Sequence, residues 1–320
     1  MKRKMSIIAG LSVCGLLFAG CSSAGVTDPG PSASHQAAGG GGGSSEDLGA
    51  SIVAAVKVDP AVQKLLPAEY AKSGVLQEGT NIQFPPANFF ASDGKTPIGN
   101  EIDTAKAIAA RLGVKVEFQN SPFENLITSL QSGRVDFTMA SMNDTPERQK
   151  KIDFVDYFKT GIGMLVKKGN PDNIKTPQDL CGHSVTAGVA SSQATWAKQL
   201  SQKCVADGHK AIDVVESNDD QQRLNSVRTG RDTAELNDLA NLLYIARTAG
   251  NGAYFEVANS EPLEGALYGI GVTKGNTALR DAIQAALQSL MDDGTYQKIL
   301  DAWGLTSAYI GKATVNAGTD

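Results

Sequence analysis

The chain has 320 residues, of which 41% are hydrophobic and 20% are charged, and its formal net charge is -5. This length and composition fit an ordinary globular protein of about two domains. The acidic balance, without a long run of Lys and Arg, argues against a nucleic-acid-binding protein.

Residues 1–20 have the pattern of a targeting segment. Residues 2–4 (KRK) give a positive start, and the apolar stretch that follows is too short to span a bilayer. We therefore predict a signal peptide over residues 1–20. The sequence LFAGC, which ends at Cys21, resembles a bacterial lipobox, so Cys21 is predicted to carry the lipid. The alternative is an ordinary signal peptide with a chance cysteine.

Residues 21–50 are mostly Gly, Ser, Ala and Pro, with five consecutive glycines from Gly39 to Gly43. Such a segment has almost no apolar surface to bury, which predicts a flexible tether. Together with Cys21 it indicates a domain that is held near a membrane by its lipid.

Four cysteines are present, and two of them remain after the targeting region is set aside. Cys181 and Cys204 form an even pair in an exported chain, which predicts a disulfide. The cysteines and the three histidines have no metal-ligand spacing, so neither a metal nor a cofactor is expected.

From residue 51 to residue 139 the sequence predicts a helical start and then strands that alternate with helices. Proline at positions 85 and 86 stops the first strand, and glycine at 113 and 133 stops the two helices. This alternation is typical of a mostly parallel sheet. The expected strands are 75–84, 114–119 and 134–139, and the expected helices are 102–112 and 123–132.

An acidic pair, Glu101 and Asp103, begins the first of these helices. Two carboxylates allow acid–base catalysis. Acids at a helix start more often interact simply with the helix dipole, and we favour that interpretation.

The stretch around Arg148 suggests an anion site. Thr145 is placed to cap a short helix and Pro146 to fill its first position, so Arg148 falls in the first turn. A cation is unfavourable there unless an anion lies close by, and such an anion would also meet free backbone N–H groups. The alternative is a surface arginine paired with Glu147 or Asp144.

Further strands and helices alternate from residue 161 onward. The junction at Ser191 and Ser192 offers hydroxyls and N–H groups to a second anion, although plain helix capping would explain one of the two serines. Asp238 ends a strand and begins a helix. The expected strands are 161–166, 184–189, 211–216, 234–238, 254–257 and 265–272. The main expected helices end at 204, 229, 249 and 291, and the tail after residue 313 is expected to be disordered.

The sequence ASMNDTPER at residues 140–148, followed by IDF and YF, resembles the binding motif of a known family. This family is the bacterial extracellular solute-binding proteins of family 3, the polar amino acid receptors of ABC importers. The resemblance extends from about Leu76 to Leu305 and includes the closing Trp303-Gly304 pair. It implies an α/β fold of the type II periplasmic-binding-protein kind, with two parallel-sheet lobes joined by two crossing segments. Lobe 1 would comprise 51–159 and 264–320, and lobe 2 would comprise 160–263.

The resemblance also implies an amino acid site between the lobes. Arg148 and the N–H groups near Ser192 would bind the carboxylate. Asp238, which as a lone residue could equally be a helix cap, would bind the ammonium with oxygens near Ser141 or Asn143. Two aromatic rings would enclose the stem of the ligand, although a core role for Phe84 is an alternative. The full predicted set is Phe84, Phe123, Ser141, Asn143, Arg148, Ser191, Ser192 and Asp238.

These features together predict a lipid-anchored extracytoplasmic receptor that delivers a polar amino acid to an ABC importer. Its expected partners are the amino acid, the permease subunits and the membrane through its lipid, and it is expected to be a monomer. The alternative is an enzyme similar to the periplasmic cyclohexadienyl dehydratases, with Glu101 or Asp103 as base. A sensory module is disfavoured because no transmembrane or signalling segment follows in this sequence. Which amino acid is bound cannot be read from the sequence.

Overall fold

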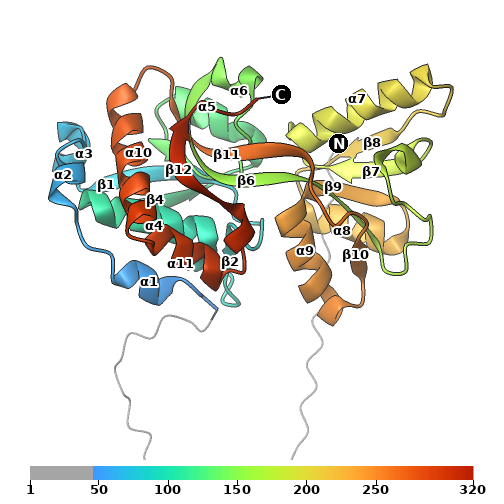
Figure 1. Ribbon diagram of the computed structural model, residues 1–320, viewed down its shortest axis with the longest axis horizontal. Helices are drawn as coiled ribbons and strands as arrows, with labels where there is room; N and C mark the ends of the chain where they lie inside the picture. Colours follow the sequence, from blue (N-terminus) through green and yellow to red (C-terminus); the bar gives the residue numbers. More distant parts are fainter. Residues whose placement is uncertain (1–45, 320) are drawn as a thin grey trace, which may run out of the picture. The chain divides into compact units, whose positions relative to one another are not determined.

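A computed structural model describes residues 46–319 (Figure 1). The predicted signal peptide, Cys21 and most of the predicted tether lie outside these residues. Residues 46–50 are the part of the predicted tether that the structure describes. The carboxylate of Glu46 accepts a hydrogen bond from the backbone N–H of Ser92 at 2.8 Å, and Asp47 pairs with Lys106 at 3.7 Å, so polar contacts join residues 46 and 47 to the folded domain.

The helices include most of those predicted, although the helical start consists of three short helices. None of the helices within residues 46–319 is long and apolar enough to cross a membrane. They are α1 (Ala50–Ala54), α2 (Pro60–Gln63), α3 (Ala68–Ser73), α4 (Asn100–Leu112), α5 (Leu126–Gln131), α6 (Pro146–Gln149), α7 (Ser192–Ala206), α8 (Asp220–Thr229), α9 (Leu239–Thr248), α10 (Thr277–Asp292) and α11 (Thr295–Ala302).

Ten strands of the described chain belong to one sheet, and β2 pairs with β3 separately. The strands are β1 (Val75–Thr80), β2 (Phe89–Phe90), β3 (Pro97–Ile98), β4 (Lys115–Asn120), β5 (Phe137–Thr138), β6 (Ile152–Lys167), β7 (Ser184–Ala187), β8 (Asp213–Glu216), β9 (Ala234–Asp238), β10 (Phe255–Val257), β11 (Leu263–Thr273) and β12 (Tyr309–Val315).

The sheet has two parallel parts joined by long antiparallel strands. Its order is β4-β1-β5-β11-β6-β9-β7-β8, with β10 and β12 also paired to β6. β1 is parallel to β4 and β5, and β7 is parallel to β8 and β9, whereas β6 and β11 run antiparallel to each other. β6 and β11 therefore connect the group containing α4, α10 and α11 with the group containing α7, α8 and α9 (Figure 1). This arrangement matches the predicted fold of two parallel-sheet lobes.

The connection between the two parts is a continuous strand rather than a loop. The expected strand 161–166 is only the second half of β6, which runs without a break from Ile152 to Lys167. β11 is irregular near its start, where its register against β6 shifts between Leu263 and Ala266 and Glu264 has a φ of 48°. The lobe boundaries at 159/160 and 263/264 remain predictions.

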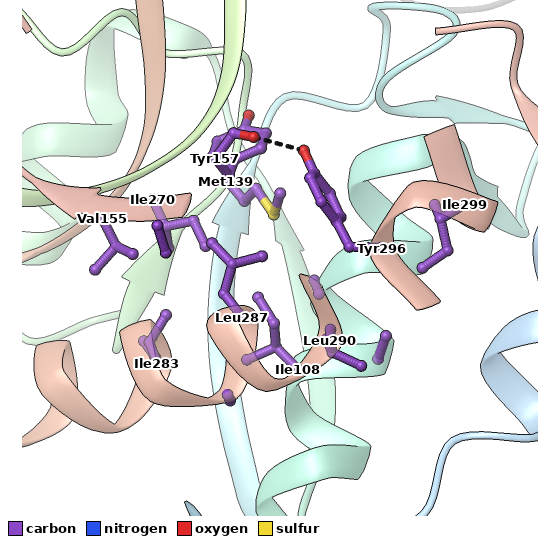
Figure 2. Close-up of a cluster of buried hydrophobic side chains, with 14 of the residues drawn as sticks. Ile108, Met139, Val155, Tyr157, Ile270, Ile283, Leu287, Leu290, Tyr296 and Ile299 are labelled. Carbon is purple, nitrogen blue, oxygen red and sulfur yellow. Dashed lines mark hydrogen bonds between the residues drawn. The ribbon is translucent and has the colours of Figure 1, made fainter. Parts of the chain in front are cut away.

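The larger apolar core lies between the sheet and the helices α4, α10 and α11. Asn276 caps α10 by accepting the N–H of Leu279 at 3.3 Å. Ile283 and Leu287 of α10 then point toward Ile270 of β11, while the hydroxyl of Tyr296 donates to the carbonyl of Tyr157 at 2.8 Å (Figure 2). Each buried side chain of this kind contributes about 1.5–3 kcal/mol. This core fixes the strand ends that carry the site.

The end of the described chain is ordered, contrary to the prediction of disorder after residue 313. β12 pairs with β6, and the N–H groups of Ala317 and Gly318 donate to Asp156 and Asp144 at 3.1 and 2.8 Å. The prediction failed because this segment is held by backbone hydrogen bonds, which need no apolar side-chain pattern.

The predicted disulfide is present in the structure. Cys181 and Cys204 are bonded, with their Cα atoms 5.7 Å apart. Cys204 is buried in the apolar cluster between α7 and the sheet, and Cys181 packs at its edge.

Loss of this disulfide is expected to destabilise the protein. Cys181→Ser should lower the free energy of unfolding by about 2–4 kcal/mol, because the unfolded chain regains the freedom of the closed loop. Urea unfolding of the variant and of the wild type measures the change. Reductant should lower the stability of the wild type by a similar amount and leave the variant unaffected. Free thiols at both positions in protein exported from cells would contradict the prediction.

Candidate functional site

A cavity with a volume of about 70 Å³ lies where the ends of the strands meet, and polar side chains from both parallel parts of the sheet line it. All eight residues of the predicted site are among its lining residues. They are Phe84, Phe123, Ser141, Asn143, Arg148, Ser191, Ser192 and Asp238. The sequence prediction therefore located one site, although the role of each residue in ligand binding stays a prediction.

Arg148 is positioned by the short helix that the sequence indicated. Thr145 caps α6 by accepting the N–H of Arg148 at 3.3 Å. The guanidinium donates through Nη1 to the carbonyl of Asn143 at 2.9 Å and through Nη2 to the carbonyl of Ala190 at 3.0 Å. Glu147, considered as a surface partner of Arg148, pairs instead with Lys150 at 2.8 Å. Arg148 thus contacts residues on both sides of the cavity.

The guanidinium of Arg148 remains positive at neutral pH. Desolvation lowers its pKa to about 10, while the charges of Asp238 and Asp144 act in the opposite direction. The guanidinium carbon lies 5.3 Å from the centre of the Phe123 ring, a cation–π geometry that fixes its plane. A planar, oriented guanidinium is suited to binding a carboxylate.

Asp238 occupies the cap position of α9, but its side chain does not cap the helix. Its carboxylate accepts hydrogen bonds from Thr160 at 3.1 Å and from Gln193 at 3.0 Å, and only 3% of the residue is exposed. Burial raises its pKa to about 7, whereas hydrogen bonds from Tyr268 and Thr160 and the charge of Arg148 lower it. A nearby cation would therefore stabilise its ionised form.

The two serines at the start of α7 have different roles. The Ser191 hydroxyl accepts the N–H of Ala194 at 3.0 Å, which is the expected cap. The Ser192 hydroxyl donates to the side-chain carbonyl of Asn143 at 2.7 Å and so links α7 to the segment before α6. The first-turn N–H groups of α7 lack partners within the helix, which gives this wall of the cavity a positive potential.

Ser141 is held by an acid that the sequence interpretation assigned to the helix dipole. Glu101 is fully buried and accepts both the N–H of Ser141 at 3.0 Å and its hydroxyl at 2.8 Å, together with the hydroxyl of Tyr157. Ser141 has a φ of 50°, a left-handed conformation that is strained for a residue other than glycine. Glu101 lies in the first turn of α4, as the dipole interpretation requires, and it also supports the backbone of the cavity wall.

Asp103 has a structural contact of its own, away from the cavity. It accepts the indole N–H of Trp303 at 2.8 Å, and burial raises its pKa to about 7. Neither Glu101 nor Asp103 is among the residues that line the cavity. The two acids considered as an enzymatic base are thus placed in the interior of the fold.

Phe84 and Phe123 both reach the cavity, as predicted. Phe89, which follows the prolines closely, does not line the cavity. Its ring packs edge-on against Trp303, with ring centres 5.8 Å apart.

The sequence interpretation missed several polar residues of the cavity. Gln193 holds Asp238, and Arg223 is buried between Asp220 and Glu235. Burial raises the pKa of Glu235 to about 7, and the charge of Arg223 opposes this shift. The sequence did contain one signal of this buried ion-pair cluster. Asp220 and Arg223 are one helical turn apart, and Glu235 interrupts an apolar strand. In the described part of the chain, no group of three or more His, Cys, Asp or Glu side chains could hold a metal ion.

Comparisons with known proteins identify the class. Residues 76–306 match the model of the bacterial extracellular solute-binding proteins, family 3. The L-cystine-binding protein TcyJ of Escherichia coli K12 is 31% identical over 258 residues, covering 80% of this chain and 92% of that protein. The protein belongs to this family of solute-binding proteins.

Solved structures of related proteins have a similar fold. An ancestral arginine-binding protein bound to arginine is 35% identical, with a TM-score of 0.66, and the match covers 72% of this chain and 98% of that one. The ancestral amino acid-binding protein AncCDT-1, described as a precursor of cyclohexadienyl dehydratase, is 31% identical with the same TM-score, and the match covers 73% and 97%.

Proposed function

We propose that this protein is an extracytoplasmic receptor that binds a polar amino acid in the cavity and delivers it to an ABC importer. The observation that carries the proposal is the presence of Arg148 and Asp238, a fixed cation and a buried acid, in the lining of one cavity. The relatives support it, since they are named as cystine-binding and arginine-binding proteins.

In this proposal the two charged ends of the amino acid meet complementary groups. Arg148 and the N–H groups at the start of α7 bind the carboxylate. Asp238 binds the ammonium, with the Ser141 hydroxyl as a further acceptor, while Phe84 and Phe123 cover the stem. The cavity is partly closed, so each ionic contact is stronger than it would be at an open surface. The buried positions of Glu101 and Asp103 argue against the dehydratase alternative.

The proposal is tested by a thermal-shift screen of the mature domain against the common amino acids. A ligand at about 1,000 times its dissociation constant should add about 4 kcal/mol to the free energy of unfolding. The melting temperature should then rise by several degrees. The bound amino acid should be recovered unchanged after long incubation. If none of the amino acids shifts the melting temperature, or if the ligand is converted, the proposed function is wrong.

Membrane anchoring belongs to the same proposal and rests on the lipobox-like sequence before Cys21. We expect the wild type in the membrane fraction and Cys21→Ser in the medium or another soluble fraction, because the variant lacks the acceptor for the lipid. Fractionation followed by immunoblotting measures the distribution. Cys181→Ser serves as a control for cysteine loss as such. Unchanged membrane association of Cys21→Ser would contradict lipid anchoring.

A further inference from the structure

The charges that line the cavity leave one acid without an ionic partner. The lining includes two bases, Arg148 and Arg223, and three acids, Glu124, Asp220 and Asp238. An amino acid's own zwitterion is matched by Arg148 and Asp238 and adds no net charge. Arg223 is already paired with Asp220 and with Glu235 beneath it. Among the three acids that line the cavity, Glu124 is then the one without an ionic partner once the zwitterion is bound.

Glu124 is fixed in place but only half satisfied. It follows Phe123 directly, on the short 3₁₀ helix before α5. Its Oε1 accepts a hydrogen bond from the side chain of Asn218 at 3.0 Å, a residue from the opposite side of the cavity. Its Oε2 is enclosed and has no hydrogen-bond partner. An enclosed carboxylate oxygen without a donor is destabilising, and a hydrogen-bond donor on the ligand would remove that cost.

The position of Glu124 is where a ligand side chain would end. Glu124, Asn218 and Arg223 line the first cavity and also a second one, with a volume of about 300 Å³, that Arg148 and Asp238 do not line. These shared residues therefore mark the end of the site away from the zwitterion. A stem that passes over Phe123 would place its distal group beside Glu124.

We propose that the ligand carries a second protonated nitrogen on its side chain and that Glu124 binds it. This rests on the proposed function, because the zwitterion must first occupy the Arg148 end. A basic amino acid, such as lysine or arginine, has the chemistry that neutralises the excess acid. A partly closed cavity favours such neutrality, since an unpaired charge is costly to bury.

A symmetric bis-amino acid such as cystine is a second source of the same distal ammonium. Its far carboxylate would need a cation, and Arg231, an exposed residue that lines the second cavity, could provide one. The affinity for cystine should therefore depend on Arg231, whereas the affinity for arginine or lysine should not. The affinity for each of these ligands should depend on Glu124.

Calorimetric titration of the mature domain with L-arginine, L-lysine, L-cystine and L-glutamine tests the proposal. We expect a distal-nitrogen ligand to bind best and Glu124→Gln to weaken it by about tenfold or more, the effect of losing one charged hydrogen bond. Glu124→Gln should change the affinity for glutamine little, since the side-chain amide of this ligand can donate a hydrogen bond to either Glu or Gln at position 124. Glu261→Gln, which removes an exposed charge that lines neither cavity, should bind like the wild type.

Arg231→Gln then distinguishes cystine from the basic amino acids, because it should weaken the binding of cystine and leave the binding of arginine and lysine unchanged. If glutamine or another neutral amino acid binds best, or if Glu124→Gln has no effect on a cationic ligand, the proposal is wrong while the receptor function stands. If none of the four binds and none of the common amino acids shifts the melting temperature, the receptor function itself fails.

Discussion

Arg148→Ala is expected to weaken amino acid binding by about 30- to 5,000-fold, which corresponds to about 2–5 kcal/mol. The guanidinium donates to Asn143 and Ala190 and lies over Phe123, so its plane is fixed before the ligand arrives. Without it, the ligand carboxylate would enter an enclosed cavity with no cation facing it. Calorimetric titration with the ligand found by thermal shift measures the loss.

Two variants control this experiment. Arg148→Lys keeps the charge but loses the planar fork, so it should recover only part of the affinity. Arg134→Ala, an exposed arginine outside the cavity, should have no effect. The unliganded Arg148→Ala protein should melt close to the wild type, since the guanidinium's two backbone contacts are peripheral to the apolar core. Affinity that survives Arg148→Ala would reject Arg148 as the carboxylate-binding residue.

The element order could be predicted because helix stops and strand patterns in this chain are local. Gly113, at a φ of 77°, ends α4 where the sequence indicated, and β9 has the predicted bounds Ala234–Asp238. β12 could not be predicted, because its pairing with β6 uses backbone groups and leaves no periodic pattern in the side chains. The strand 161–166 was predicted, but its continuity with residues 152–160 in β6 was not, because no local pattern in the side chains marks that the two segments are joined.

The site residues could be predicted only with the help of the family motif, because they come from segments far apart in the sequence. Motif matching gathered all eight into one cavity, but it could not separate the capping role of Ser191 from the contact of Ser192 with Asn143. Nor could it show that Glu101 reaches Ser141, a contact that joins residues 40 positions apart. Such long-range polar contacts depend on side-chain directions, which a motif does not record.

Proton release on ligand binding near pH 7 is the second large effect that we expect. In the unliganded protein burial raises the pKa of Asp238 to about 7, so about half of these carboxyls are protonated at neutral pH. The ligand's ammonium favours the ionised form and lowers this pKa. Affinity should therefore fall by up to about tenfold for each pH unit below 7 and become independent of pH well above it.

In the unliganded protein, the free energy of unfolding changes with pH in the direction opposite to the affinity, because it falls as the pH rises. Because the pKa of Asp238 is raised in the folded state, its contribution to the free energy of unfolding is full at low pH and is lost as the pH rises through about 7. The other charged and titratable groups that influence it are Arg148, Glu101 and Tyr268, of which Arg148 lowers the pKa and Glu101 raises it. Tyr268 stays protonated over this range because burial raises its own pKa.

Asp238→Asn is expected to remove this pH dependence and to weaken binding by about 2–5 kcal/mol, because a neutral amide cannot balance the ammonium in an enclosed site. Titrations of the wild type at pH 7 in phosphate and in Tris, whose ionisation enthalpies differ, should give different binding enthalpies that reveal the released proton. The variant should give the same enthalpy in both buffers. Asp213→Asn, on the exposed start of β8, is the control because Asp213 does not line the cavity. Asn237→Asp is not suitable, because Asn237 does line it. Proton uptake by the wild type, or an affinity that is constant from pH 5 to pH 8, would show that Asp238 does not bind the ammonium.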